Sequence, residues 1–317
     1  MSEPAAAPRS NAIRALVGGL LLLLALAFAA YAVWAERRQL SAGLHRLPVL
    51  AVAGALLCGA GAVVCTLFQW RAVLGGLGAH LDRSDSARVY FVGQLGKYVP
   101  GSVWPLLAQM ELARRHRVGR KTMLTGGVLA IVVNLAVGAV LACLLLPFVS
   151  PSALHRFWWL LACVPLLIVA LHPKVVLGTV NWVLTALRRE TLVETLSVRA
   201  ELKAAAWGLL SWALLGAHVY LLVSALGATG PRAIVASVAA GCLAVSVGIL
   251  AIPVPAGAGV REVAFVLALA AVLSHADGLL VALVSRVLLV AVDVGLAAAF
   301  AAPGRPLGKR LGGSRPS

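Results

Sequence analysis

The chain has 317 residues, of which 61% are hydrophobic and 12% are charged, whereas a soluble domain is about 25% charged. This composition excludes an ordinary soluble protein and predicts a polytopic membrane protein. The formal net charge of +16 fits basic loops that set membrane topology and touch anionic lipid headgroups. Since no basic–aromatic nucleic-acid motif accompanies it, nucleic acid is not an expected partner.

Eight apolar segments are candidates for the roughly 20-residue length of a membrane span. In chain order they cover 13–35, 47–69, 122–147, 157–172, 204–227, 233–252, 262–275 and 278–301. Residues 1–12 form a polar tail before the first span, and residues 302–317 form a basic, Gly/Pro-rich tail that we expect to be disordered. The sequence therefore predicts one transmembrane domain over 13–301 and no soluble catalytic domain.

The distribution of Lys and Arg predicts the orientation of these spans. With a cytoplasmic N-terminus, 21 of the 27 basic residues fall on the cytoplasmic side, while Arg286 lies within the eighth span. The other 5 fall on the outside: Arg37, Arg38, Arg46, Arg156 and Arg232. Cytoplasmic loops carry the excess of basic residues in most membrane proteins. We therefore expect both termini in the cytoplasm and the chain in the cytoplasmic (inner) membrane.

Residues 91–110 are apolar but broken by Gly96, Pro100, Gly101 and Pro105. Broken segments survive at membrane depth only where protein or a water-filled cavity covers the freed backbone. Basic residues flank the segment on both sides, so both ends should face the cytoplasm. This predicts a re-entrant helical hairpin with its turn near 99–101; an amphipathic helix lying on the membrane surface is the alternative.

Residues 174–203 alternate apolar and charged side chains, which predicts one or two helices on the cytoplasmic surface. A second broken segment follows at 251–262, where two prolines end the sixth span. We expect this break, like the first, at the cytoplasmic side. The predicted fold class is thus an all-α membrane protein with about eight spans and one re-entrant hairpin.

The first constellation of candidate site residues is the sequence QLGKYVPG at 94–101. Pro100 and Gly101 favour a sharp turn, after which a helix would point its N-terminus into the membrane, where free N–H groups attract anions. Lys97 adds a cation and Tyr98 a hydroxyl, which together suggest a site for a phosphate or another anionic headgroup. In the alternative, Lys97 reaches to the membrane interface.

The second constellation is PVPAGAGVRE at 253–262. Its candidate headgroup-binding residues are Pro255, Gly257, Gly259, Arg261 and Glu262. Arg261 would contact the headgroup and Glu262 would form an ion pair or couple protons. Alternatively, Glu262 caps the following helix.

The third constellation is Arg286 with Asp293 inside the eighth span. Seven residues apart, the two side chains share a helix face but lie about 10 Å apart along the axis, so each needs another partner. Glu262 is a candidate partner for Arg286, and Arg261 or Lys97 for Asp293. Charged residues inside spans commonly face a cavity or a partner, so these two are also candidate site residues.

No metal ion or other cofactor is predicted. All five cysteines fall in apolar runs without a CxxC or Cys/His spacing, and the sequence has no phosphate-binding ATPase loop, HExxH zinc motif or GxSxG nucleophile. Asn134, His218 and Tyr220 are expected to form hydrogen bonds between helices.

The motifs LGKYVPGSVW at 95–104 and IPVPAGAGVREVAF at 252–265, with the basic run RRHRVGRK at 114–121 between them, resemble the transmembrane region of lysylphosphatidylglycerol synthases, also called the flippase-like domain family. The resemblance covers about 12–301. It implies an eight-span module that moves a lipid with a large polar headgroup between leaflets. It implies a role in the site for Lys97, Pro100 and Gly101 and for the five residues of the second constellation. Full-length synthases add a soluble aminoacyl-transferring domain, which is not expected here.

Three functions follow as hypotheses. The first is a lipid flippase or transporter for an aminoacylated phospholipid or a polyprenyl-phosphate-linked glycan. The second is an integral-membrane transferase that acts on a lipid-linked sugar, with Glu36, Asp277 or Asp293 as the base. The third is a non-transporting partner of an envelope-lipid enzyme. The sequence does not predict the oligomeric state.

Overall fold

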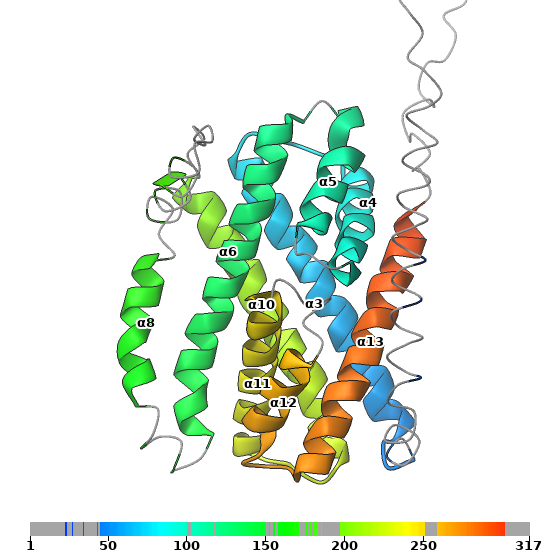
Figure 1. The fold of residues 1–317 in the computed structure, drawn as a ribbon, viewed down its shortest axis with the longest axis vertical. Helices are drawn as coiled ribbons and strands as arrows, with labels where there is room; N and C mark the ends of the chain where they lie inside the picture. Colours follow the sequence, from blue (N-terminus) through cyan, green and yellow to red (C-terminus); the bar gives the residue numbers. More distant parts are fainter. Residues whose placement is uncertain are drawn as a thin grey trace, which may run out of the picture.

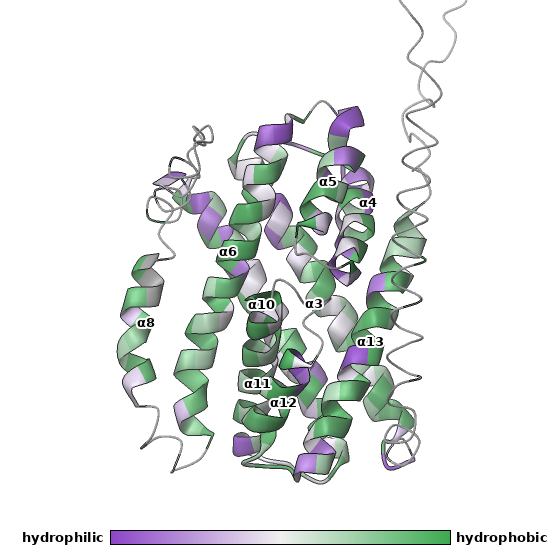
Figure 2. Ribbon diagram, in the orientation of Figure 1, coloured by the Kyte–Doolittle hydropathy of each residue, from purple (hydrophilic) through white to green (hydrophobic). Residues whose placement is uncertain are grey.

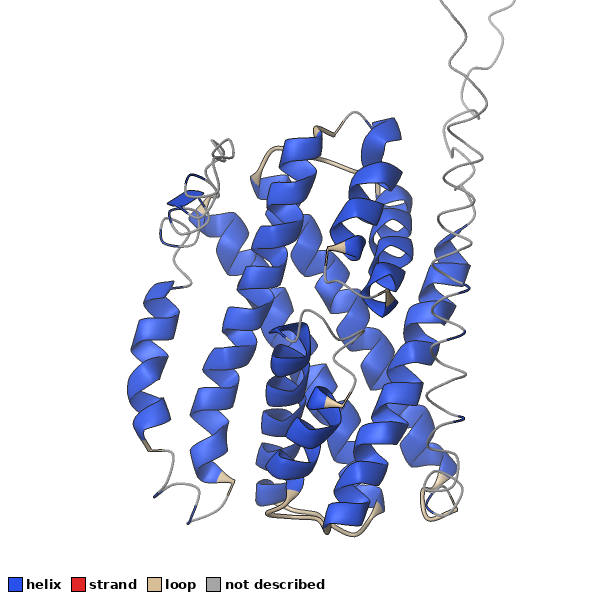
Figure 3. Cartoon of the chain, in the orientation of Figure 1, coloured by secondary structure: helices blue, strands red, loops and turns tan. Residues whose placement is uncertain are grey.

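The protein is described here from a computed structural model. The structure describes residues 45–99, 103–116, 118–149, 158–170, 197–250 and 259–301, together with isolated positions elsewhere. These residues form α-helices and short 3-10 helices and no strand (Figure 3). The predicted all-α fold class is confirmed.

Five of the described helices are long and apolar enough to cross a membrane, which makes the chain a multi-pass membrane protein. They are α3 (Val49–Gly76), α6 (Arg120–Leu145) with its 3-10 extension η3 (Leu146–Phe148), α10 (Val198–Ala225), α11 (Pro231–Leu250) and α13 (His275–Ala301). Each of them matches a span expected from the sequence.

Of the expected span 157–172, the structure describes α8 (Trp159–Ala170). The helix α12 (Val260–Leu269) has 10 residues and is shorter than the expected span 262–275. At 1.5 Å per residue, α12 is about 15 Å long, roughly half the thickness of the hydrocarbon core. The expected span at 13–35 lies outside the described residues. So does most of the expected surface segment 174–203, whose last residues form the start of α10.

The first broken segment folds as two short helices packed side by side. α4 (Arg83–Gln94) continues as the 3-10 turn η1 (Leu95–Tyr98), and α5 (Trp104–Ala113) packs back along α4. Gly96 permits this approach, because a Cβ there would lie 2.7 Å from the backbone nitrogen of Pro105. A short 3-10 turn, η2 (Arg114–His116), ends the pair.

The second broken segment also joins two packed helices, α11 and α12. In Figure 1 the α4–α5 pair occupies the upper half of the molecule and the α11–α12 pair the lower half, and α12 begins near mid-height. The start of α12 therefore lies inside the helix bundle, away from the end at which the α4–α5 pair lies. This differs from the sequence-based expectation that both breaks lie at one side.

Two apolar cores support this arrangement. One surrounds the α4–α5 pair and includes Trp70, Phe91 and Met123; the other surrounds the α11–α12 pair and includes Leu222, Phe265 and Leu280. Burying large side chains of this kind contributes roughly 1.5–3 kcal/mol each. Each helix pair is thus fixed by its own core.

The long helices α3 and α10 pass through both halves and pack against each other in opposite directions. The fully buried His218 of α10 joins them to α13, because its Nδ1 lies 2.7 Å from the Ala55 carbonyl oxygen and its Nε2 lies 2.9 Å from Ser285 Oγ. Since a carbonyl can only accept, Nδ1 donates, and the neutral ring accepts from the Ser285 hydroxyl at Nε2. The expected interhelical role of His218 is confirmed.

Candidate functional site

The end of η1 meets the middle of α13 at Asp293. The Lys97 ammonium nitrogen lies 2.6 Å from Asp293 Oδ2, and the Tyr98 hydroxyl donates to the same oxygen at 2.6 Å. Asp293 is 4% exposed. A buried carboxylate needs such a cation and such a donor, because an unpaired buried charge is strongly unfavourable. Lys97, one of the two partners that the sequence suggested for Asp293, is the one that the structure places there.

The start of α12 meets α13 about two turns earlier, at Arg286. Arg286 Nη1 donates to Glu262 Oε1 in a close ion pair, as the sequence suggested. Glu262 also accepts a hydrogen bond from the Gly259 backbone N–H at 2.6 Å through Oε2. Glu262 therefore both caps α12 and forms an ion pair with Arg286.

Gly259 is the N-cap of α12 and has φ = +80°. This left-handed conformation is open to glycine and disfavoured for residues with a Cβ. It turns the chain so that the first turn of α12 points Arg261 and Glu262 toward α13. The backbone conformation thus explains why a glycine occupies position 259.

Arg261 lies between the two ion pairs. It is within electrostatic reach of Tyr98, Arg286 and Asp293, and its guanidinium carbon lies 5.7 Å from the centroid of the Phe265 ring. Its Nη2 is buried and has no hydrogen-bond partner among the described residues, and the same holds for Asp293 Oδ1. Buried polar atoms are rarely left unsatisfied, so each such atom calls for an explanation, for example a bound water or ligand.

The cluster carries a net positive charge. Lys97, Arg261 and Arg286 supply three cations, while Glu262 and Asp293 supply two carboxylates. Hydrophilic segments stand out at the start of α12 and in the middle of α13 between hydrophobic helix turns (Figure 2). One additional anion would neutralise the net charge of the cluster.

Four other predicted site residues, Pro100, Gly101, Pro255 and Gly257, lie outside the described residues. Among the residues that the structure describes, no group of three or more His, Cys, Asp or Glu side chains could hold a metal ion. The sequence did not predict that Tyr98 donates to Asp293; its position next to Lys97 in the same 3-10 turn was the available signal.

No curated protein matches the chain. Residues 12–297 match the family described as the lysylphosphatidylglycerol synthase TM region. The match contains both broken segments and the whole charge cluster, and it covers most of the 317 residues. The chain therefore belongs to the lysylphosphatidylglycerol synthase transmembrane-region family.

Proposed function

We propose that the protein is a flippase-like transporter that moves a lipid with an anionic headgroup across the cytoplasmic membrane, and that the headgroup passes through the cluster of Lys97, Tyr98, Arg261, Glu262, Arg286 and Asp293. The observation that carries the proposal is the net positive charge of this cluster within helices of a membrane protein. Ionisable groups inside a membrane are costly and commonly mark a transport pathway. Membership of a lipid-handling family supports the same function.

The unsatisfied atoms support an anionic ligand. The buried Arg261 Nη2 has no acceptor in the described part of the chain, and a phosphate oxygen would supply one in a charge-assisted hydrogen bond. Lys97 has 38% of its side chain exposed, so its ammonium can contact a ligand while it remains near Asp293. Both lipid classes expected from the sequence carry a phosphate: polyprenyl-phosphate-linked glycans are anionic, whereas aminoacylated phospholipids carry an ammonium group beside the phosphate.

In this proposal the α4–α5 pair enters the membrane from the cytoplasmic side as a re-entrant hairpin. Both helices are too short to span, at 12 and 10 residues. Val89, Tyr90 and Phe91 of α4 are buried in the protein, whereas a helix lying on the membrane surface would present such residues to lipid. The large share of Lys and Arg in the flanking segments supports the cytoplasmic orientation.

The transferase alternative requires a carboxylate that can act as a base. Asp277 has both oxygens engaged, Oδ1 with Arg46 at 2.5 Å and Oδ2 with Ser274 at 2.9 Å. Asp293 has one unpartnered oxygen, but that atom is buried beside two cations. Its other oxygen, Oδ2, is engaged by Lys97 and the Tyr98 hydroxyl. The third candidate base, Glu36, lies outside the described residues. Transport is therefore the function that the geometry supports better.

The test is reconstitution of the protein into vesicles that contain fluorescent anionic, zwitterionic or neutral lipids in both leaflets. A membrane-impermeant reductant quenches the outer-leaflet lipid, and lipid that is moved outward becomes quenched in turn. We expect translocation of phosphate-bearing anionic lipids above the rate in protein-free vesicles. An unchanged leaflet distribution for every lipid class would overturn the proposal.

A further inference from the structure

The helices of this protein repeat in order and reverse in direction. The segment 49–148 contains a long helix, α3, then the short pair α4 and α5, then a second long helix, α6. The segment 198–301 contains a long helix, α10, then the pair α11 and α12, then a second long helix, α13. In Figure 1, α3 runs upward and α10 downward, and the two pairs enter from opposite ends.

The contacts between the segments follow the same symmetry. α4 of the first segment packs on α13 of the second, and its counterpart α11 packs on α6. Likewise, α3 packs on α13 and α10 packs on α6. Along α3 and α10, Ser211 donates to the Ala62 carbonyl oxygen and His218 to that of Ala55, an antiparallel pairing that places a pseudo-two-fold axis near mid-length.

The charge cluster lies where the two segments meet. Lys97 and Tyr98 come from the tip of the first short pair, while Arg261 and Glu262 come from the tip of the second. Transporters built from inverted repeats place their substrate site at the repeat interface near the middle of the membrane. They open that site to one side at a time as one repeat rocks against the other.

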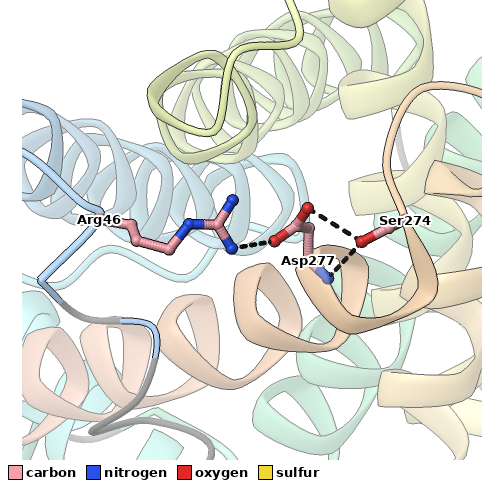
Figure 4. Close-up of polar contacts among 3 residues, drawn as sticks. All are labelled: Arg46, Ser274 and Asp277. Carbon is pink, nitrogen blue, oxygen red and sulfur yellow. Dashed lines mark hydrogen bonds and ion pairs between the residues drawn. The ribbon is translucent and has the colours of Figure 1, made fainter.

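An ion pair fixes the lower end of the molecule. Arg46, just before α3, contacts Asp277 in the first turn of α13 at 2.5 Å, and the Ser274 hydroxyl donates to the other oxygen of Asp277 at 2.9 Å (Figure 4). The neighbouring Leu47 is buried in the core around the α11–α12 pair. The contact thus joins the start of the first segment to the last helix of the second.

We propose that residues 49–148 and 198–301 form an inverted repeat that gives alternating access to the charge cluster. In this proposal the Arg46–Asp277 ion pair, called the latch below, keeps the cluster closed toward the end of the molecule where α13 begins. The starts of α3 and α13 must separate at this ion pair for the cluster to open toward that end. The role of the latch in lipid movement rests on the proposed transport function. The repeat itself rests on the helix order and contacts alone.

The first experiment closes the latch covalently. Arg46→Cys and Asp277→Cys are combined in a background in which the five native cysteines are replaced, and the pair is joined by a short, reducible thiol cross-linker. We expect translocation to fall to the protein-free rate after cross-linking and to recover after reduction. Each single cysteine variant cannot be cross-linked, so its translocation rate should be the same before and after the same treatment.

The second experiment measures access to the charge cluster by the rate of cysteine labelling and does not depend on lipid transport. Val260, at the tip of the second pair, is 37% exposed. In a Val260→Cys variant, a membrane-impermeant maleimide added from the Arg46 side should react faster when Asp277→Asn opens the latch. We expect an increase of about 1.5- to 5-fold, the range that a partly exposed ion pair allows. Glu111→Gln, which breaks the exposed Glu111–Arg114 pair, is the matched control and should leave the rate unchanged.

The two experiments separate the two proposals. If the wild type moves no lipid of any class, the transport function fails, and the labelling rates still decide whether the latch controls access. If the wild type moves lipid and the cross-linked protein moves it equally fast, the latch is overturned while the transport function stands. Equal labelling of Val260→Cys with and without Asp277→Asn would also overturn the latch.

Discussion

Removing either member of the Lys97–Asp293 pair should destabilise the protein, but by unequal amounts. Asp293 is 4% exposed, whereas 38% of the Lys97 side chain is exposed. Lys97→Met leaves a buried carboxylate that still accepts a hydrogen bond from the Tyr98 hydroxyl at 2.6 Å. Breaking a buried pair in this way costs about 3–5 kcal/mol, and the retained hydrogen bond places the expected loss near 3 kcal/mol.

Asp293→Asn is expected to cost less. The Lys97 ammonium is exposed enough to find water, and the Tyr98 hydroxyl can still donate to the amide oxygen. The loss is then that of a charge-assisted hydrogen bond, about 1–2 kcal/mol. The double variant removes both charges together, so it should be about 2 kcal/mol more stable than the sum of the two single changes predicts.

The assay is the free energy of unfolding in mixed micelles, measured for the wild type, both single variants and the double variant. Glu111→Gln, which affects an exposed ion pair, controls for a general loss of charge and should change stability by less than about 1 kcal/mol. The reasoning is refuted if Asp293→Asn is as destabilising as Lys97→Met, or if the two losses simply add.

Three further predictions concern the turns and the second ion pair. Gly96→Ala should destabilise the α4–α5 pair by about 1–3 kcal/mol, because its Cβ would lie 2.7 Å from the backbone of Trp104 and Pro105; Gly75→Ala, with open space around it, should not. Thermal unfolding compares the two. Gly259→Ala should cost about 1–2 kcal/mol at φ = +80°, and an unchanged melting temperature would contradict the strained cap. Arg286→Met should destabilise more than Arg286→Met combined with Glu262→Gln, which chemical unfolding can test, since only the single change leaves the buried Glu262 charge without Arg286.

Much of the helix order could be predicted from the sequence, because long apolar runs and charge asymmetry act locally. The same kind of reasoning paired Arg286 with Glu262 and named Lys97 as a partner for Asp293, since buried charges need counterions. The depth of the second break could not be predicted in this way. Arg261 follows a Pro/Gly-rich segment that is typical of a loop, and only the packing of α12 against α11 and α13 places it inside the bundle.

The contact between Arg46 and Asp277 was also missed. Arg46 was assigned to an outside loop, and Asp277 was considered only as a candidate base. Opposite charges in two segments predicted on the same side were a usable signal, but pairing them requires knowing that α3 and α13 are neighbours. Neighbour relations between distant helices depend on tertiary packing, which hydrophobicity and charge counts do not specify.

The most direct measurement for the proposed site is the lipid selectivity of Arg261→Gln in the reconstituted translocation assay. In the proposed site the buried Arg261 Nη2, which has no acceptor among the described residues, donates a hydrogen bond to the anionic headgroup. Wild-type protein should move a phosphate-bearing anionic lipid faster than a zwitterionic one, and Arg261→Gln, verified as folded, should lose that preference. An unchanged ratio of the two rates in Arg261→Gln would contradict headgroup recognition at this cluster.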